Sequence, residues 1–129
     1  MKHFVCERCG NLVALLHGDG KRISCCERPI SEITPRLGGE GKEKHTPVIH
    51  VKGDEVRVTV GPEGGMHPME SRHAIAWICL ITSGGNQRKM LDPDGNAEAV
   101  FKLAEGERVV RAFAYCNLHG LWVAECKIC

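Results

Sequence analysis

The feature that most constrains this chain is the placement of its cysteines. Four of the eight lie within the first 26 residues, as one Cys-x-x-Cys pair and one adjacent pair: Cys6, Cys9, Cys25 and Cys26. The segment that carries them has too few large apolar residues to form a core of its own. A piece of this size needs another source of stability, so the cysteines predict a small module held together through sulfur.

Either disulfides or a metal could hold such a module together. The N-terminus, MKHFVCERCG, lacks the apolar stretch of a signal peptide, so we expect a cytoplasmic protein, where thiols stay reduced. Two turns that each present two sulfurs can enclose a cation tetrahedrally. Adjacent cysteines rarely bond to each other, because the short ring strains the peptide between them. A metal site is therefore favoured over disulfides or free thiols, and the spacing leaves zinc and iron open.

The charge distribution excludes several functional classes. The chain has 17 Lys and Arg residues and 16 Asp and Glu residues, and its net charge is +1. These charges are interspersed, so there is no basic stripe of the kind that binds nucleic acid. No apolar run approaches the roughly 18 residues of a membrane helix. We therefore expect neither a nucleic acid nor a membrane as a partner.

From Thr46 onward the sequence is typical of β-structure. Residues 47–51 and 56–60 flank a KGDE turn, and the apolar run HAIAWICLIT suits a central strand. Shorter strand candidates follow, separated by turn residues: RKML, AVFKL, VVRAFAY and LWVAE. Short strands with turns about every ten residues predict an antiparallel sandwich, although AEAVFKLAEGE could contain a helical turn. The stretch ITPRLGGEGKEK before them is interpreted as a linker or exposed loop.

A second group of metal-binding residue types falls in loops at the ends of these expected strands: His45, His67, His73, Cys116 and His119. Four imidazoles and one thiolate are more ligands than structural zinc takes. They suit a five-coordinate transition metal with one position open. Taken singly, each histidine is better explained as a surface residue, and Cys116 with His119 could be a nucleophile and its base. The prediction of a metal depends on the whole set.

Five stretches, in order, resemble the desulfoferrodoxin family, the two-iron form of superoxide reductase: CERCG, the CC pair, EKHTPVIH, HPMESRHAIAWI and YCNLHG. The resemblance covers essentially the whole chain. It implies a mainly β protein, with a desulforedoxin-like module in residues 1–34 and an immunoglobulin-like antiparallel β-sandwich in residues 35–129.

The same resemblance implies two iron ions, without haem or nucleotide. One iron is held by Cys6, Cys9, Cys25 and Cys26, and the other equatorially by four histidines and axially by one cysteine: His45, His67, His73, His119 and Cys116. The implied reaction is the one-electron reduction of superoxide to hydrogen peroxide, with a rubredoxin-like electron donor, in a homodimer. Whether the first iron relays electrons or only stabilises the fold stays open. An electron carrier and a zinc-stapled binding protein are the alternative functions.

Two charged residues, Glu43 and Lys44, precede His45 and match the EKH pattern of the family. By resemblance, Lys44 attracts superoxide to the open position and helps to supply protons, and Glu43 closes onto ferric iron as a sixth ligand. The alternative is that both belong to a solvated linker. The thiolate of Cys116 has to keep its charge, so we expect backbone amides of the NLHG turn to point at its sulfur.

The C-terminal pair Cys126 and Cys129 lies outside the family pattern. It could be an exposed redox dithiol that forms a disulfide, a metal site shared between subunits, or part of a frayed tail. For the remaining residues of interest, we expect Cys79, Trp77 and Trp122 in the core and His3, His17 and His50 at the surface.

Overall fold

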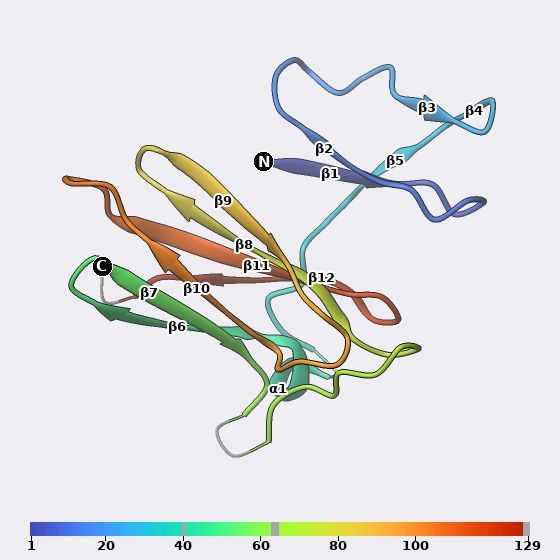
Figure 1. The fold of residues 1–129 in the computed structure, drawn as a ribbon. Coiled ribbons are helices and arrows are strands. Elements are labelled where there is room, and N and C mark those ends of the chain that lie inside the picture. Colours follow the sequence, from blue (N-terminus) through green and yellow to red (C-terminus); the bar gives the residue numbers. More distant parts are fainter. Residues whose placement is uncertain (40, 63–64, 128–129) are drawn as a thin grey trace. The chain divides into compact units, whose positions relative to one another are not determined.

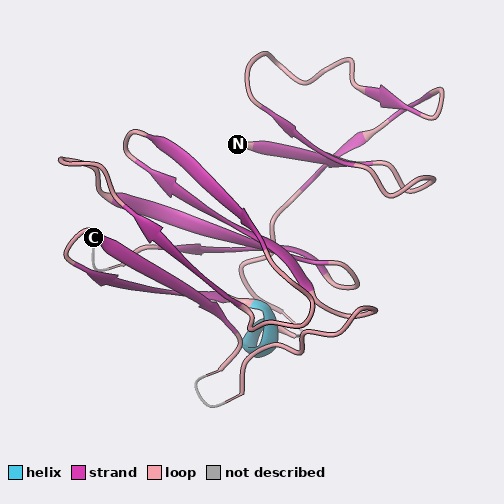
Figure 2. Cartoon of the chain, in the orientation of Figure 1, coloured by secondary structure: helices cyan, strands magenta, loops and turns pink. Residues whose placement is uncertain are grey.

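Strands and loops make up nearly all of the structure, a computed structural model that describes residues 1–39, 41–62 and 65–127. Figure 2 shows one short helix among the described residues, α1 (Lys42–His45). None of the helical structure in this described part is long and apolar enough to cross a bilayer. The contacts divide the chain into two units, Met1–Thr34 and Pro35–Cys129, and each is described by itself.

The first unit contains five short strands (Figure 1): β1 (Lys2–Val5), β2 (Leu12–Leu15), β3 (Ser24–Cys25), β4 (Arg28–Pro29) and β5 (Ser31–Ile33). One sheet has the order β2-β1-β5, and β3 and β4 form a separate hairpin. Among the described residues of this unit, Phe4 and Cys6 are the buried apolar ones. His3, expected at the surface, is buried, because β1 is the middle strand of its sheet.

The second unit holds seven strands: β6 (Pro47–Lys52), β7 (Glu55–Val60), β8 (Ile75–Thr82), β9 (Gly85–Met90), β10 (Glu98–Lys102), β11 (Val109–Cys116) and β12 (Gly120–Glu125). They form two sheets, with the orders β10-β7-β6 and β12-β11-β8-β9, and every pairing is antiparallel. The expected antiparallel sandwich after a cysteine-rich module is therefore confirmed. The helical alternative for residues 97–107 is wrong, since β10 covers residues 98–102 and the rest of the stretch is loop and turn.

The core of the second unit lies between these two sheets. Alternate residues of β7, such as Val56 and Val58, join Ile78 and Leu80 of β8 in one buried apolar cluster. Each such side chain stabilises the fold by about 1.5–3 kcal/mol on burial. Cys79 is fully buried, as expected. This unit thus has a rigid frame of its own, and loops at the ends of its strands can be held in fixed positions.

The expected linker is partly ordered structure. The Arg36 amide donates to the Leu121 carbonyl (2.9 Å), and the Val123 amide donates to the Arg36 carbonyl (3.0 Å), so this segment pairs with β12. Farther along, α1 ends at His45 just before β6 begins. Because of these two attachments, the charged stretch is held against one end of the sandwich.

Candidate metal centres

The first candidate centre is formed by the four cysteines of the first unit. The sulfurs of Cys6, Cys9, Cys25 and Cys26, called here the four-cysteine centre, all lie within 4.8 Å of one another. A tight turn brings the first two together: the Gly10 amide donates to the Cys6 carbonyl at 2.8 Å, and Gly10 has a φ of 81°. That positive φ favours glycine.

The adjacent cysteine pair is explained by the β3–β4 hairpin. Cys25 pairs with Arg28, so Cys26 and Glu27 form a two-residue loop, and their φ angles are 53° and 63°. Left-handed conformations at both loop residues are the mark of a type I′ turn, which usually takes Asn-Gly. Non-glycine residues pay about 1–3 kcal/mol each in such positions. A metal ion bound to the sulfurs of Cys25 and Cys26 would offset this strain and stabilise the turn.

The pKa values of three of these thiols favour a bound cation. The Cys9 backbone amide lowers the pKa of Cys6 to about 6. By contrast, hydrogen bonding with the Cys9 and Cys6 sulfurs raises the pKa of Cys26 to about 12, and that of Cys25 is raised for the same reason. One thiol therefore ionises easily at the expense of its neighbours. A bound metal ion reverses this, since it deprotonates the thiols that coordinate it.

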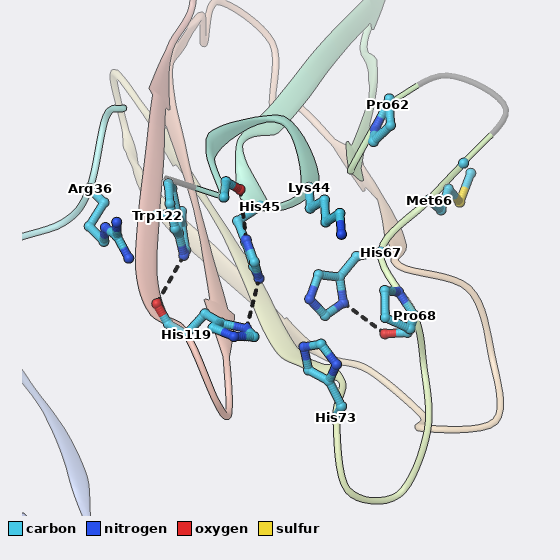
Figure 3. A pocket seen from close by; sticks show the side chains of 12 residues that line it. Arg36, Lys44, His45, Pro62, Met66, His67, Pro68, His73, His119 and Trp122 are labelled. Atoms are coloured by element: carbon cyan, nitrogen blue, oxygen red, sulfur yellow. Dashed lines mark hydrogen bonds between the residues drawn. The ribbon is translucent and has the colours of Figure 1, made fainter. Parts of the chain in front are cut away.

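The second candidate centre lies at one end of the sandwich. It comprises His45, His67, His73, Cys116 and His119, called here the histidine–cysteine centre, whose ligand atoms also lie within 4.8 Å of one another. Figure 3 shows the four imidazoles converging on a common space. The Cys116 sulfur is 3.5 Å from His67 Nε2 and 3.6 Å from His119 Nδ1, and His45 Nε2 is 3.1 Å from His119 Nδ1.

Each ligand comes from the end of a strand or helix. His45 closes α1, His67 follows β7, His73 precedes β8, and Cys116 is the last residue of β11. His119 lies in the three-residue turn between Cys116 and its partner Gly120, which has a φ of 85°. A glycine with positive φ after a three-residue loop is a common hairpin closure. The HG of YCNLHG therefore shapes the turn that presents His119.

Hydrogen bonds to the backbone fix the orientation of two imidazoles. His45 Nδ1 lies 2.8 Å from the Gly41 carbonyl, and His67 Nδ1 lies 2.7 Å from the Pro68 carbonyl. Each Nδ1 therefore carries the proton and leaves Nε2 with a lone pair for a metal. Burial lowers the pKa of His45, and it lowers the pKa of His67 to about 4. Both rings are neutral at pH 7, as metal ligands have to be.

The donor set fits a metal ion. His73 Nε2 is buried and, among the described residues, has no hydrogen-bond partner. Such an orphaned buried nitrogen is costly unless something binds it. Nitrogen and sulfur donors in this combination suit iron and other transition metals. Both groups of ligands expected for the two iron centres are thus present, and together they are consistent with two-iron centres.

A cavity of about 600 Å³ adjoins the imidazoles, with Lys44 at its edge (Figure 3). Lys44 is exposed and lies on α1, so its ammonium can reach the cavity. Glu43 does not line this cavity: it lines an adjacent hollow with Gly39, Gly41, Lys42 and also Lys44. The structure therefore places Lys44 beside the metal ligands and Glu43 outside that cavity. The expected catalytic roles of both residues stay predictions.

Two residues of the site were missed by sequence reasoning. Trp122, expected only in the core, is buried but also stacks on the His45 ring, with centroids 4.9 Å apart, and donates from Nε1 to the His119 carbonyl at 3.1 Å. Gly61 has a φ of 99°, and a Cβ there would lie 2.6 Å from the His67 backbone nitrogen. An isolated glycine after a strand is the weak signal that could have indicated this second contact.

The expected amide hydrogen bonds to the Cys116 sulfur are not found in the described part of the chain. The polar atoms beside that sulfur are the two imidazole nitrogens of His67 and His119. The Asn117 amide donates instead to the Ala74 carbonyl at 3.2 Å, which continues the pairing of β11 with the approach to β8. For Asn117 the expectation was wrong, because strand pairing takes up this first amide of the turn.

The geometry of the C-terminal cysteine pair is not described, because Cys129 lies outside the described residues. Cys126 is half-buried against the apolar core, and its amide donates to the Val110 carbonyl at 2.9 Å. Cys126 is disulfide-bonded in this structure, which agrees with the dithiol interpretation, and the role of the pair stays a prediction.

Both the sequence and the fold match known proteins. Residues 38–125 match the family model described as Desulfoferrodoxin. Desulfoferrodoxin from Syntrophotalea carbinolica is 43% identical over 122 residues, which cover 95% of this chain and 94% of that protein. Desulfoferrodoxin from Nitratidesulfovibrio vulgaris is 40% identical over 122 residues, with the same coverage.

Solved structures agree with this. The superoxide reductase from Treponema pallidum matches with a TM-score of 0.79 and 34% identity, over 96% of both chains. The superoxide reductase (1Fe-SOR) from Giardia intestinalis matches with a TM-score of 0.52 and 34% identity, over 67% of this chain and 100% of that one. From its cysteine and histidine groups, its fold and its relatives, this chain belongs to the desulfoferrodoxin family.

Proposed function

We propose that this chain is a superoxide reductase. The observation that carries the proposal is the histidine–cysteine centre, in which four imidazoles and one thiol converge beside a cavity that has a lysine at its edge. Solved relatives with this fold are named superoxide reductases. The reaction adds one electron and two protons to superoxide and yields hydrogen peroxide.

The chemistry of the residues suits an anionic substrate. The rings of His45 and His67 are neutral because burial lowers the pKa of each, so they add no charge to the site. Cys116 contributes one negative charge as a thiolate. Ferrous iron, when bound, brings two positive charges and supplies the electron, so the centre keeps a net positive charge that attracts superoxide. The thiolate of Cys116 would also donate electron density to a metal held by these residues.

Lys44 and Glu43 have separate parts in this proposal. The ammonium of Lys44, at the edge of the cavity, raises the local concentration of superoxide and holds a proton near the site. Glu43 would act as a ligand to ferric iron after turnover. That role requires the Glu43 side chain to move toward the imidazoles, because it lines the adjacent hollow in this structure.

The remaining assignments rest on the family resemblance and on the state of the thiols. We assign iron to the four-cysteine centre, a rubredoxin-like protein as electron donor, and a homodimer as the assembly. The free thiols of both centres suit a reducing compartment, for which we propose the cytoplasm. The pair Cys126 and Cys129 would serve as a redox dithiol that the product peroxide can oxidise.

The test is to mix the reduced, iron-loaded protein with superoxide and to measure the products. A reductase yields one hydrogen peroxide for each superoxide consumed and releases no dioxygen. Release of one dioxygen for every two superoxide ions would indicate a dismutase. Slow oxidation without any preference for superoxide would indicate an electron carrier. A protein that binds only zinc would be colourless, because the sulfur-to-iron charge-transfer bands would be missing.

A further inference from the structure

The pairing of β8 with β11 has an irregularity next to the histidine–cysteine centre. Tyr115 pairs with Trp77, but the next residue, Cys116, pairs with Ile75. Ala76 is therefore the extra residue of a β-bulge, and its carbonyl accepts from the Leu91 amide on the other side (2.9 Å). A bulge bends the strand and redirects the chain beyond it. Here that chain is the short segment that carries His73.

Beyond the bulge, Asn117 takes over the pairing with its side chain. Its backbone amide donates to the Ala74 carbonyl (3.2 Å), and its side-chain Oδ1 accepts from the Ala74 amide (3.0 Å). Its Nδ2 donates to the Arg72 carbonyl at 3.0 Å. Three hydrogen bonds thus connect a residue of the YCNLHG turn to both chain neighbours of His73.

The rest of the segment depends on a local turn. The Glu70 amide donates to the His73 carbonyl (2.9 Å), and the His73 amide donates to the Glu70 carbonyl (3.2 Å). This turn gives the segment its shape, but it does not fix the distance from His73 to the ligands on β11. The His73 and His119 rings touch edge to face, with centroids 5.0 Å apart. Among the hydrogen bonds of residues 70–74, those of Asn117 are the ones that reach the turn holding Cys116 and His119.

We propose that Asn117 is a positioning residue of the histidine–cysteine centre. It sets the place of His73 relative to Cys116 and His119, so that the buried Nε2 of His73 meets the same metal ion as the other two. The amide side chain suits this role because the Ala74 amide needs an acceptor and the Arg72 carbonyl needs a donor. The proposal rests on the metal-binding role proposed for these three ligands.

The experiment uses the full-length protein with iron in both centres and compares two variants with one control. Asn117→Ala removes both side-chain bonds. Asn117→Asp keeps the acceptor for the Ala74 amide but turns a second oxygen toward the Arg72 carbonyl. The control is Asn86→Ala, which removes an exposed asparagine from β9, whose side chain makes one weak contact with Cys79 Sγ at 4.0 Å.

Two measurements are made without superoxide: the rate at which a chelator extracts iron from each centre, and the ferric charge-transfer and paramagnetic resonance spectra. We expect Asn117→Ala to lose iron from the histidine–cysteine centre about 10-fold faster or more, as for other residues that orient metal ligands. Its spectra should also change in shape. Asn117→Asp should fall between the wild type and Asn117→Ala. The four-cysteine centre is the internal reference and should be unaffected.

Unchanged extraction and spectra in Asn117→Ala, relative to Asn86→Ala, would overturn the proposal. Equal acceleration at both centres would also overturn it, because that result indicates general destabilisation. If Asn117→Ala does not fold, Asn117→Asp decides by the same two measurements. Neither measurement involves catalysis, so a failure of the proposed reaction would leave the outcome readable.

Discussion

The two candidate metal centres depend on their surroundings in opposite ways. The four-cysteine centre lies in a unit whose described residues bury only Phe4 and Cys6 among their apolar side chains. The histidine–cysteine centre lies at the end of a sandwich with an apolar core from both of its sheets. Two buried apolar side chains stabilise a fold by about 3–6 kcal/mol at most. A structural metal bound to thiolates contributes on the order of 10 kcal/mol.

The comparison indicates that the dependence between metal and fold runs in opposite directions in the two units. In the first unit a bound metal would stabilise the fold. The loop at Cys26 and Glu27 is strained, and the neighbouring thiols raise the pKa of Cys26, so a cation is needed to hold the thiolates together. In the second unit the fold makes the site, because strands hold the ligands whether or not a metal is bound. Removal of ligands should therefore unfold one unit and leave the other folded but inactive.

The largest expected effect comes from Cys9→Ser. With one sulfur of the four-cysteine centre gone, the first unit should lose its metal and its fold, because little apolar burial remains. Hydrogen exchange resolved by strand measures this: protection in β1, β2 and β5 should disappear, while β8 and β11 should stay protected. Cys79→Ala is the control, since it removes a buried cysteine that belongs to neither centre.

Persistent protection of β1 in metal-free Cys9→Ser would contradict this contrast and indicate that the first unit folds alone.

The same variant also tests electron relay from the four-cysteine centre. With the histidine–cysteine centre already reduced, it should consume superoxide as fast as the wild type does. A loss of rate under those conditions would mean that the first centre takes part in the chemical step.

The next largest effect is expected for Cys116→Ser. Four imidazoles remain to bind iron, and the sandwich keeps its core, so the fold should persist. The thiolate charge-transfer band should disappear. The rate with superoxide should fall by more than about 100-fold, because losing a ligand should cost more than losing a residue that only orients a ligand. Absorption and stopped-flow rates measure the two effects. A variant that kept its rate would show that the thiolate has no electronic role.

A smaller effect is expected for Gly61→Ala. The added Cβ would lie 2.6 Å from the His67 backbone nitrogen, and φ at this position is 99°, so the loop has to move. His67 should shift away from the other ligands, and iron should leave the histidine–cysteine centre about 10-fold faster. Gly53→Ala is a matched control, because Gly53 also has a positive φ, 62°, but its Cβ would meet nothing within 4 Å. Equal effects would trace the loss to backbone strain alone.

The metal ligands and the sheet could be predicted from the sequence, but the residues that position the ligands could not. Metal ligands have to be particular residue types, so the cysteines and histidines of both groups stood out in the sequence, and alternating valines such as Val56 and Val58 predicted the sheet. Asn117, Trp122 and Gly61 could not be found in this way. Each acts through tertiary contacts, chiefly with Ala74, His45 or His67, and residue type alone does not indicate which contacts the fold will make.

The smallest expected effect is that of Lys44→Met, and it separates the charge of the pocket from its architecture. Methionine keeps most of the unbranched side chain and removes the ammonium, so the ligands and their spectrum should not change. The second-order rate with superoxide should fall by about 10-fold at low ionic strength, and the difference should shrink as salt screens the charge. Lys42→Met is the matched control: Lys42 is on the same helix and exposed, but it lines the hollow that contains Glu43 rather than the cavity beside the imidazoles. If both variants lost rate equally, the attraction would come from the charge of the whole helix. If neither did, the positive charge of the iron site itself would be enough to attract superoxide, and the fold would contribute nothing to steering beyond holding the five ligands in place.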